Sequence, residues 1–393
     1  MTMSSQPGAA IVGVGHSSLQ RGAQDSLGAL TAQACMAAVS DAGLKPEDID
    51  GLATYPKAPY SGSAGVQGSD VAGIDFMLSR FPWPRLRWFA ELQTGMIASA
   101  VIEAVHAINA GACEVALVWR ALHNPTGNYG SYTAPSRSGD AQFTAPYGLV
   151  SILQWHALAY ARYLHEHGAS REAMAEVVTQ QRSNAARNPV AYFRDKPLTK
   201  DGYLSSRMIS DPLSLLDCDL PIQGCAAVVI ARSDLSERSW DRAANIVGYA
   251  QNLAPLSTGL HYTLADTFTV GRKLADSLWS GCGLAPSDMD TAQLYDGFSP
   301  TIYYWLEALG FCGRGEAPGF VSEGNISPTG GLPLNTFGGS LSEGRLHGIG
   351  HVIEAARQVT GRAGDRQIPD ARTSVVTTGS PLLRSGALVL QSS

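Results

Sequence analysis

The sequence predicts a duplicated α/β fold built from two similar halves. The segment Gly43–Asp50 recurs as Gly283–Asp290 at an offset of 240 residues, and the tyrosines that follow them, Tyr55 and Tyr295, share this offset. At 393 residues, the chain is longer than a typical single domain and long enough for two halves of this kind. Alternating strand and helix patterns in both halves indicate an α/β sheet.

Two further repeats occur in the same order along the chain. Ala9–Gly13 matches Ala244–Gly248, and Val101–Ala104 matches Val352–Ala355. Duplicated halves usually pack face to face, so that equivalent loops meet at one place. We therefore expect the functional site where the halves meet.

The first elements follow from local sequence patterns. Ala9–Gly15 is a short β-branched run closed by glycines, which predicts a strand and a tight turn. Asp25–Gly43 has apolar residues at helical spacing and ends on a glycine suited to a C-terminal cap. Pro46 and the acids after it predict a turn into the strand Gly51–Tyr55.

The rest of the first half contains a helix, a buried strand and a long variable region. Thr94–Ala110 predicts a helix that Gly111 ends, and the apolar run Glu114–Trp119 predicts a buried strand. Residues 121–148 are rich in Gly, Pro, Ser, Asn and Tyr and predict a functional or interfacial loop. Helices are expected again over Leu149–Asn188.

The boundary between the halves is predicted near residue 240. The strand Cys225–Ala231 closes the first half, and the polar segment Ser233–Arg242 connects it to the second. We assign residues 1–240, including the loop region 121–235, to the first half and residues 241–393 to the second.

The second half repeats the same scheme. Its expected elements are the strand Ile246–Ala250, the helix Val270–Gly281, the strand Thr291–Tyr295, the helix Pro300–Leu309, a glycine-rich segment over 329–350, the helix His351–Thr360 and the strand Ser374–Thr378.

Composition excludes several classes of protein. The net charge of −6 comes from acids and bases scattered without long runs, so we expect no binding to nucleic acid. No apolar run approaches the roughly 20 residues that span a bilayer, and the N-terminus lacks a basic segment ahead of an apolar one. We expect a soluble, cytoplasmic protein without a membrane span. The six cysteines form no C-x-x-C pair, which argues against a disulfide framework and a metal site.

Common nucleotide and hydrolase motifs are weak or missing. Gly13 and Gly15 follow a strand, but Ser18 stands where a dinucleotide fingerprint needs its third glycine. The sequence contains neither a G-x-S-x-G elbow nor a GK[ST] phosphate loop.

Two motifs stand out. Tyr295-Asp-Gly-Phe-Ser-Pro300 lies where a strand passes into a helix, the edge at which open α/β sheets bind ligands. The alternative is a strand-end tyrosine followed by a capping serine. The segment Asn335–His351 carries Arg345 and His347 among glycines, which predicts close approach to a ligand. Its alternative is a flexible surface loop.

Together with the duplication, these motifs resemble the thiolase superfamily, in particular its sterol-carrier and lipid-transfer branch. The resemblance covers Ala9–Leu390 and implies a layered αβαβα fold. In that family a reactive cysteine begins the helix that here follows Glu91-Leu92-Gln93-Thr94-Gly95-Met96, and the residue aligned with it is Leu92. The family's His-Pro pair corresponds to Arg345-Leu346, and its second cysteine falls in Val376-Thr377-Thr378-Gly379.

These replacements determine which chemistry the resemblance implies. A leucine can neither ionise nor attack, so Leu92 excludes a covalent acyl-enzyme at that position. A retro-aldol cleavage needs no such nucleophile: a base removes the β-hydroxyl proton, and the Cα–Cβ bond breaks to leave a thioester enolate. We expect the backbone amides of Leu92 and Gly379 to stabilise that enolate.

Tyr295 is the predicted group for proton transfer. The steroid side-chain aldolases of this branch resemble this chain and also have a tyrosine at the start of the Asp-Gly-Phe-Ser motif. Ionising a tyrosine at neutral pH costs roughly 4 kcal/mol without help, which a cation such as Arg345 would reduce. His347 is the alternative to Tyr295 as the base, since an unperturbed histidine has a pKa of about 6.5. Some aldolases of the branch carry a second tyrosine at the position of Arg345.

The sequence thus predicts a carbon–carbon lyase: a retro-aldolase that splits a β-hydroxyacyl-CoA, such as a steroid or other bulky thioester, into a ketone or aldehyde and a shorter acyl-CoA. The alternative is a non-catalytic thiolase-like subunit that binds acyl-CoA or lipid. The resemblance implies a homodimer and a partner protein with an OB-fold and a zinc ribbon. Apart from coenzyme A in the substrate, we expect no cofactor.

Overall fold

Nine strands of the protein form one mixed sheet. The computed structural model describes residues 8–22, 24–55, 65–93, 96–124, 141–235, 243–253, 264–381 and 384–393. Within these residues the strand order is β3-β2-β4-β7-β1-β8-β11-β10-β9. The strands are β1 (Ala9–His16), β2 (Gly51–Thr54), β3 (Trp88–Glu91), β4 (Val115–Leu122), β7 (Gly224–Arg232), β8 (Ala244–Leu253), β9 (Thr291–Gln293), β10 (Thr373–Gly379) and β11 (Arg384–Ser392).

The sheet order confirms the duplication. The series β2-β4-β7-β1 is followed by its counterpart in reverse, β8-β11-β10-β9. β2 is parallel to β4 as β9 is parallel to β10, and β7 is antiparallel to both its neighbours as β11 is to its own. The halves join where β1 pairs with β8, Ala10 opposite Asn245 and Ile11 opposite Ala244.

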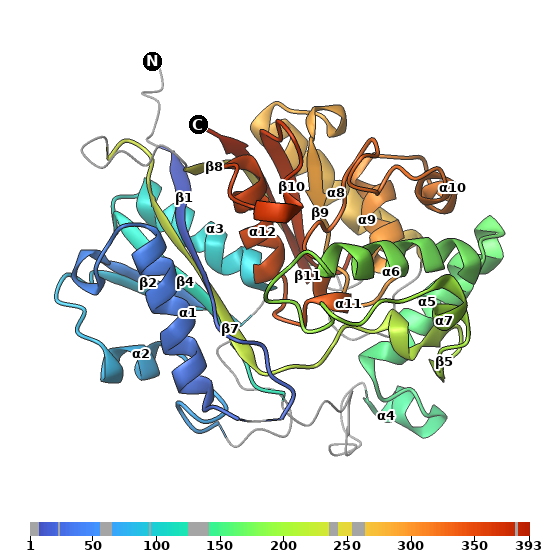
Figure 1. The fold of residues 1–393 in the computed structure, drawn as a ribbon, viewed down its shortest axis with the longest axis horizontal. Coiled ribbons are helices and arrows are strands. Elements are labelled where there is room, and N and C mark those ends of the chain that lie inside the picture. Colours follow the sequence, from blue (N-terminus) through green and yellow to red (C-terminus); the bar gives the residue numbers. More distant parts are fainter. Residues whose placement is uncertain are drawn as a thin grey trace.

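Helices complete a five-layer αβαβα arrangement (Figure 1). α1 (Leu27–Asp41) covers the outer face of the first half, and α8 (Leu264–Cys282) covers that of the second. α3 (Met96–Asn109) and α12 (Ile349–Val359) lie between the half-sheets, in an apolar cluster with strands of both halves. The predicted layered fold is therefore confirmed, and both central helices lie inside the molecule.

The remaining helices lie mainly beside the second half. α5 (Ile152–His167) and α6 (Arg171–Ala185) pack in one apolar cluster with α8 and α9 (Thr301–Leu309), as Figure 1 also shows. The other elements are α2 (Ile74–Arg80), α4 (Ala141–Thr144), α7 (Lys200–Leu204), α10 (Ala317–Ser322), α11 (Gly339–Ser342), the short helices η1 (Pro46–Asp48), η2 (Ala145–Tyr147), η3 (Leu215–Asp217), η4 (Pro286–Asp288) and η5 (Gly364–Arg366), and the hairpin of β5 (Met208–Ser210) and β6 (Leu213–Ser214).

Some sequence predictions fall outside the described residues. Residues 125–140, most of the loop expected over 121–148, are not described. The same holds for residues 236–242, most of the connection expected over 233–242. The domain division at residue 240 stays a prediction. The edge strand β3 and the long strand β11 were not predicted.

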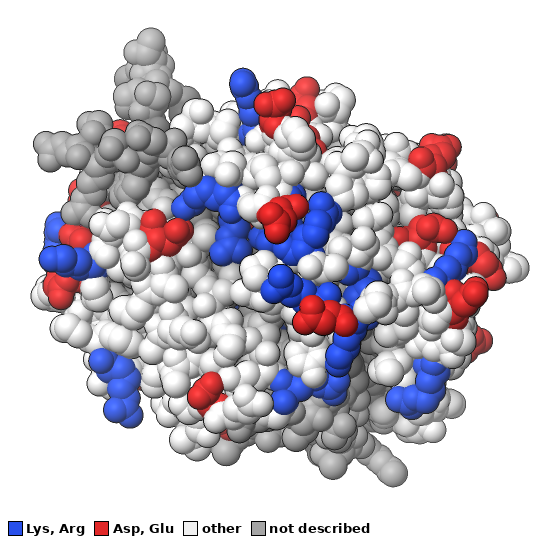
Figure 2. Space-filling model, viewed as in Figure 1, with Lys and Arg blue, Asp and Glu red and all other residues white. Residues whose placement is uncertain are grey.

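Acidic and basic side chains are interspersed on the surface (Figure 2). In Figure 2, basic side chains gather across the middle of one face, with acidic side chains among them. Ion pairs such as Arg362–Asp41, at 3.1 Å, join opposite charges within the described part of the chain. Over those same residues, none of the helices combines the length and apolar character needed to cross a bilayer.

Gly13 and Gly15 serve packing in this structure. They lie in β1, where α1 crosses the strand closely. A Cβ atom on Gly13 would lie 2.3 Å from the Ala38 carbonyl oxygen, and one on Gly15 would lie 2.2 Å from that of Ala34. The glycines that resemble a dinucleotide motif are therefore needed for contact between helix and strand.

Replacing Gly13 by alanine should lower the free energy of unfolding by about 1–3 kcal/mol, because helix backbone must move to admit the methyl group. Gly281→Ala is the matched control: its added methyl would contact nothing, so stability should stay unchanged or rise by up to about 1 kcal/mol. Urea unfolding of both variants measures the difference. Equal stability of Gly13→Ala and the wild type would contradict the packing role.

Candidate active site

A buried carboxylate joins the two motifs that the sequence analysis singled out. Asp296, next to Tyr295, accepts hydrogen bonds from the backbone amides of Ser340 and Leu341 at 2.8 and 3.1 Å. Its Oδ1 atom also lies 3.0 Å from Nε2 of His351 at the start of α12. Asp296 therefore fixes the Tyr295–Pro300 motif against the glycine-rich segment.

Gly339 makes this contact possible. Its φ of +63° is in the left-handed region, and a Cβ atom there would lie 2.1 Å from Oδ2 of Asp296. A side chain at this position would therefore displace the carboxylate.

Tyr295 lies among polar groups just beyond β9. It is 7% exposed, and its backbone amide donates to Oγ1 of Thr377 at 2.9 Å. Its ring centroid is 5.8 Å from that of His351. Its hydroxyl lies over Gly297, 3.0 Å from where a Cβ atom of that residue would be. The Tyr295 ring is therefore buried near His351, with its hydroxyl beside Gly297.

Arg345 contacts a carboxyl group that the sequence analysis did not single out. Its Nη1 atom lies 3.7 Å from Oδ1 of Asp219, and its backbone amide donates to the Leu220 carbonyl at 2.9 Å. The Asp219 amide donates to the carbonyl of Gly297 at 3.1 Å. Arg345 and Asp219 thus form a buried pair. Gly297 links this pair to Tyr295, because it bonds to the Asp219 amide and lies next to the Tyr295 hydroxyl.

Burial controls the charge of Asp219. Removal from water raises its pKa to about 8; the charge of Asp296 adds to the rise, and Arg345 opposes it. The carboxyl group therefore holds its proton at neutral pH for most of the time. Sequence reasoning could not identify Asp219 as a site residue. A single acid between a cysteine and an apolar strand is too common a pattern to be specific.

The neutral ring of His347 carries its proton on Nε2, because Arg120 occupies the Nδ1 side of the ring. Nε and Nη2 of Arg120 lie 3.3 and 3.2 Å from Nδ1 of His347. A guanidinium can only donate, so Nδ1 accepts and the proton of the neutral ring is on Nε2. Burial, with Arg120 and Arg345 nearby, lowers the pKa of His347 well below its usual value. This corrects the expectation of a base that titrates near neutral pH.

The predicted backbone groups have different surroundings. The amide of Leu92 donates to the Thr54 carbonyl at 2.9 Å, so it is not directed at a substrate, contrary to our expectation for this amide. Gly379 ends β10 and accepts from Nε1 of Trp305 at 3.1 Å through its carbonyl. The role of the Gly379 amide stays a prediction. The half-buried Leu92 side chain packs against the inner apolar cluster.

The end of β10 brings the separate parts together. Thr377 bonds to the Tyr295 amide, and Thr378 accepts from the Ala98 amide in the first turn of α3 at 3.3 Å. Gly348, next to His347, packs against the Thr378 side chain. Tyr295, the Arg345–His347 segment and the start of α3 therefore meet at one place, as the duplication predicts.

A cavity of about 380 Å³ adjoins this place, and Asp219 is part of its wall. Most of its lining is apolar, with two arginines among the lining residues. The lining residues are Arg21, Leu153, Phe193, Arg207, Ile209, Leu215, Leu216, Cys218, Asp219, Leu220, Pro221 and Leu341.

Neither Cys218 nor Cys312 provides a thiolate. Cys218 lies in the cavity wall, but its Sγ atom is 3.5 Å from the Ser214 carbonyl, and burial with Asp217 nearby raises its pKa to about 12. Cys312 packs against the outer cluster of the second half, and burial with Glu307 nearby raises its pKa to about 12 as well. Both remain protonated thiols, which are poor nucleophiles.

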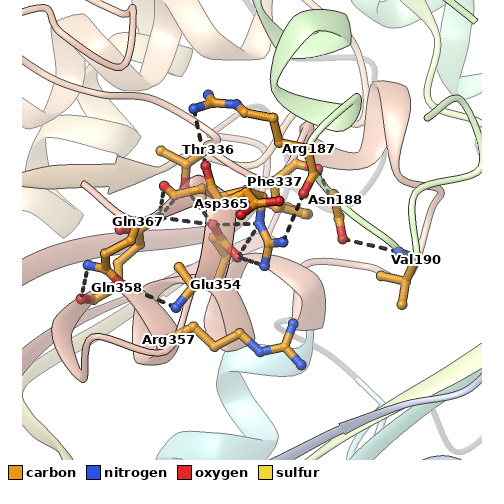
Figure 3. Close-up of polar contacts among 12 residues, drawn as sticks. Arg187, Asn188, Val190, Thr336, Phe337, Glu354, Arg357, Gln358, Asp365 and Gln367 are labelled. Carbon is orange, nitrogen blue, oxygen red and sulfur yellow. Dashed lines mark hydrogen bonds and ion pairs between the residues drawn. The ribbon is translucent and has the colours of Figure 1, made fainter. Parts of the chain in front are cut away.

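A second buried network holds the glycine-rich segment from behind (Figure 3). Glu354 of α12 accepts from Arg366 at 2.9 Å and from Oγ1 of Thr336 at 2.8 Å. Asn188, after α6, donates to the carbonyl of Phe337 at 2.9 Å. These bonds fix the start of the segment that carries Arg345 and His347.

Comparisons with known proteins agree with this geometry. Residues 263–392 match the family model described as "Thiolase C-terminal domain-like". A "Steroid side-chain-cleaving aldolase" of Thermomonospora curvata is 33% identical over 98% of this chain and 99% of its own. The "17-hydroxy-3-oxo-4-pregnene-20-carboxyl-CoA lyase" of Mycobacterium tuberculosis is 32% identical over 97% of this chain and 98% of its own.

The chain belongs to the thiolase superfamily. Within it, the chain falls in the sterol-carrier branch, as its motifs implied. A solved Ltp2-ChsH2(DUF35) aldolase superimposes with a TM-score of 0.86 at 32% identity and covers 99% of each chain. Among the described residues no cluster of His, Cys, Asp and Glu has the arrangement to hold a metal ion.

Acid should destabilise the folded protein through its buried neutral histidines. The folded pKa of His347 is lowered well below 6.5, and burial together with Arg357 and Arg366 lowers that of His16 to about 3. Below pH 6.5 the unfolded chain takes up protons that the folded chain refuses, so stability falls with pH by up to about 1.4 kcal/mol per unit for each such histidine.

His347→Asn should therefore show a shallower loss of unfolding free energy between neutral pH and about pH 5. His106→Asn is the control, because the side chain of His106 is 47% exposed and meets water in both states. Urea unfolding at a series of pH values measures the slopes. A slope for His347→Asn equal to that of the wild type would show that His347 is charged in the folded protein.

Proposed function

We propose that the protein is a retro-aldolase that cleaves the Cα–Cβ bond of a β-hydroxyacyl-CoA with a bulky acyl chain, such as a steroid side chain. The observation that carries the proposal is Leu92, an aliphatic residue at the position that the resemblance aligns with the family's nucleophile, in a chain that keeps Tyr295 just beyond the buried end of β9. Relatives similar over the whole chain are a steroid side-chain-cleaving aldolase and an acyl-CoA lyase. The reaction uses no covalent intermediate and no cofactor beyond the coenzyme A of the substrate.

Tyr295 is the proposed base. It takes the proton of the β-hydroxyl group; the β-carbon becomes a carbonyl, and the bonding electrons remain on the acyl fragment as a thioester enolate. Arg345 provides a permanent positive charge near the developing enolate. His347, kept neutral by burial with Arg120 and Arg345 nearby, is the proposed donor of a hydrogen bond through Nε2 and not the base. The Gly379 amide is a further proposed donor to the enolate.

The cavity beside Asp219 is the proposed path for the thioester. Its apolar lining fits an acyl or pantetheine chain, and Arg21 and Arg207 are cations suited to the phosphates of coenzyme A. This assignment supports a substrate that carries both a long apolar part and anionic groups.

A partner protein and a homodimer complete the proposal. The solved aldolase most relevant here is a complex with a DUF35 protein, and we propose a partner of the same kind, with an OB-fold and a zinc ribbon. The exposed Phe89 in the edge strand β3 is compatible with a second copy of the chain pairing there.

Tyr295→Phe should lower kcat/KM for cleavage by a factor of about 100 to 10,000, because the ring stays in place while the proton acceptor is lost. Tyr304→Phe is the matched control, a buried tyrosine of α9 within the apolar cluster of the second half, and should keep full activity. Release of the carbonyl product from a β-hydroxyacyl-CoA is the measurement. Unchanged turnover in Tyr295→Phe would favour the alternative, a non-catalytic subunit that binds acyl-CoA.

Incubation with acetyl-CoA should leave the mass of the intact protein unchanged, because Leu92 cannot carry an acyl group and the Cys218 thiol is protonated. Intact-protein mass spectrometry provides the measurement. An acyl adduct on any cysteine would contradict the retro-aldol mechanism in favour of thiolase chemistry.

A further inference from the structure

Asp219 combines three features that no other carboxyl group of the site has. It forms part of the cavity wall, its side chain is only 1% exposed, and its Oδ1 atom lies 3.7 Å from Nη1 of Arg345. Its backbone amide is bonded to the carbonyl of Gly297, the residue over which the Tyr295 hydroxyl lies. Asp219 therefore belongs to the cavity wall and is joined through its backbone to the residue beside the Tyr295 hydroxyl.

Retro-aldol cleavage requires a proton donor for the α-carbon in addition to the base Tyr295. Once the Cα–Cβ bond has broken, the enolate must receive a proton at Cα to become the shorter acyl-CoA. Tyr295 is placed for the oxygen on Cβ, so a second group has to serve Cα. That group must carry a proton at neutral pH and tolerate the loss of it in a buried setting.

We propose that Asp219 is the acid that protonates the α-carbon of the enolate and that Arg345 stabilises the carboxylate left behind. The inference rests on the proposed aldolase function and adds a residue and a step to it. Asp296, by contrast, accepts from the amides of Ser340 and Leu341 and lies against His351, so both of its oxygens are already engaged within the protein.

The proton count closes over one turnover. The β-hydroxyl proton moves to the Tyr295 phenolate, the Cα–Cβ electron pair becomes the enolate, and the Asp219 proton forms the new Cα–H bond. Tyr295 is then a neutral phenol and Asp219 a carboxylate. Tyr295 then releases its proton to water and Asp219 takes one up from water, which restores both groups with no net change in protons and without any oxidant or reductant.

The surroundings of Asp219 suit this cycle. The charged groups near it are Arg345 and Asp296, and Arg21 and Arg207 line the same cavity. Burial raises the pKa of Asp219 to about 8, which keeps the acid form dominant at neutral pH. Cleavage should therefore decline as pH rises through this value, because the acid form disappears.

Hydrogen exchange at the α-carbon of a short acyl-CoA tests the step separately from cleavage. The full-length protein is incubated with acetyl-CoA or propionyl-CoA in D₂O near the pKa of Asp219, and deuterium at the α-carbon is counted by mass spectrometry. The wild type should exchange, with Asp219 removing a proton and returning a deuteron. Asp219→Asn should lose at least about 100-fold of the exchange rate, the low end of the usual effect of an acid–base group.

Two variants make the result specific. Tyr295→Phe should retain exchange while losing cleavage, because the phenol serves the β-oxygen, which acetyl-CoA lacks. Glu343→Gln is the matched control: Glu343 is a buried carboxyl group whose pKa is also raised to about 8 by burial, but its Oε1 atom accepts from Asn188 at 3.0 Å, away from the cavity lining. Its loss should leave exchange unchanged.

The outcomes separate this inference from the proposed function. Exchange in Asp219→Asn at the wild-type rate would overturn the role of Asp219, as would a wild type that does not exchange, and neither would affect the assignment of Tyr295. Loss of exchange in Tyr295→Phe with retention in Asp219→Asn would assign the α-carbon to the phenol instead. Asp219→Ser is a second variant, and urea unfolding establishes that each variant is folded.

Discussion

The site depends on the contact between Asp296 and the backbone of α11. This carboxylate accepts from two successive amides and lies within hydrogen-bond distance of His351, so it ties the end of β9 to the segment that carries Arg345 and His347. The contact exists only because residue 339 is a glycine. Together with the two hydrogen bonds between Asn335 and the backbone of Leu294, it fixes the strand end that carries Tyr295 relative to the segment that carries Arg345.

Burial then sets the charges of the groups gathered there. A histidine held between arginines loses its affinity for protons, and a carboxyl group in a dry cavity wall keeps its proton despite a nearby guanidinium. The thiol of Cys218 in the same wall stays protonated for the same reason. The scaffold that relatives use for a thiolate therefore presents an oxygen acid, a phenol and a cation in this protein, which favours proton transfer over covalent catalysis.

Much of the fold could be predicted because its signals are local or repeated. The glycine-flanked strand Ala9–His16, the helix Leu27–Asp41 and the second half's helix Ile349–Val359 all follow from periodicity and caps. The edge strand Trp88–Glu91 did not, because it is a short aromatic run after prolines. The closing strand Arg384–Ser392, which pairs with the preceding strand β10 and with the distant strand β8, was not predicted either. Arg120 and Asp219 were missed because single charges beside apolar strands carry no spacing that marks them.

The sequence by itself determined the duplication and the α/β class, because repeats and periodicity are properties of the chain. Its resemblance to the thiolase superfamily implied the layered arrangement and the loss of a nucleophile at Leu92. Only the tertiary structure decided that the Leu92 amide is engaged with Thr54, that His347 is neutral with its proton on Nε2 and that Asp219 belongs to the cavity wall with a proton. These properties depend on which distant residues meet and on how much water they exclude, and neither is written in the order of the residues.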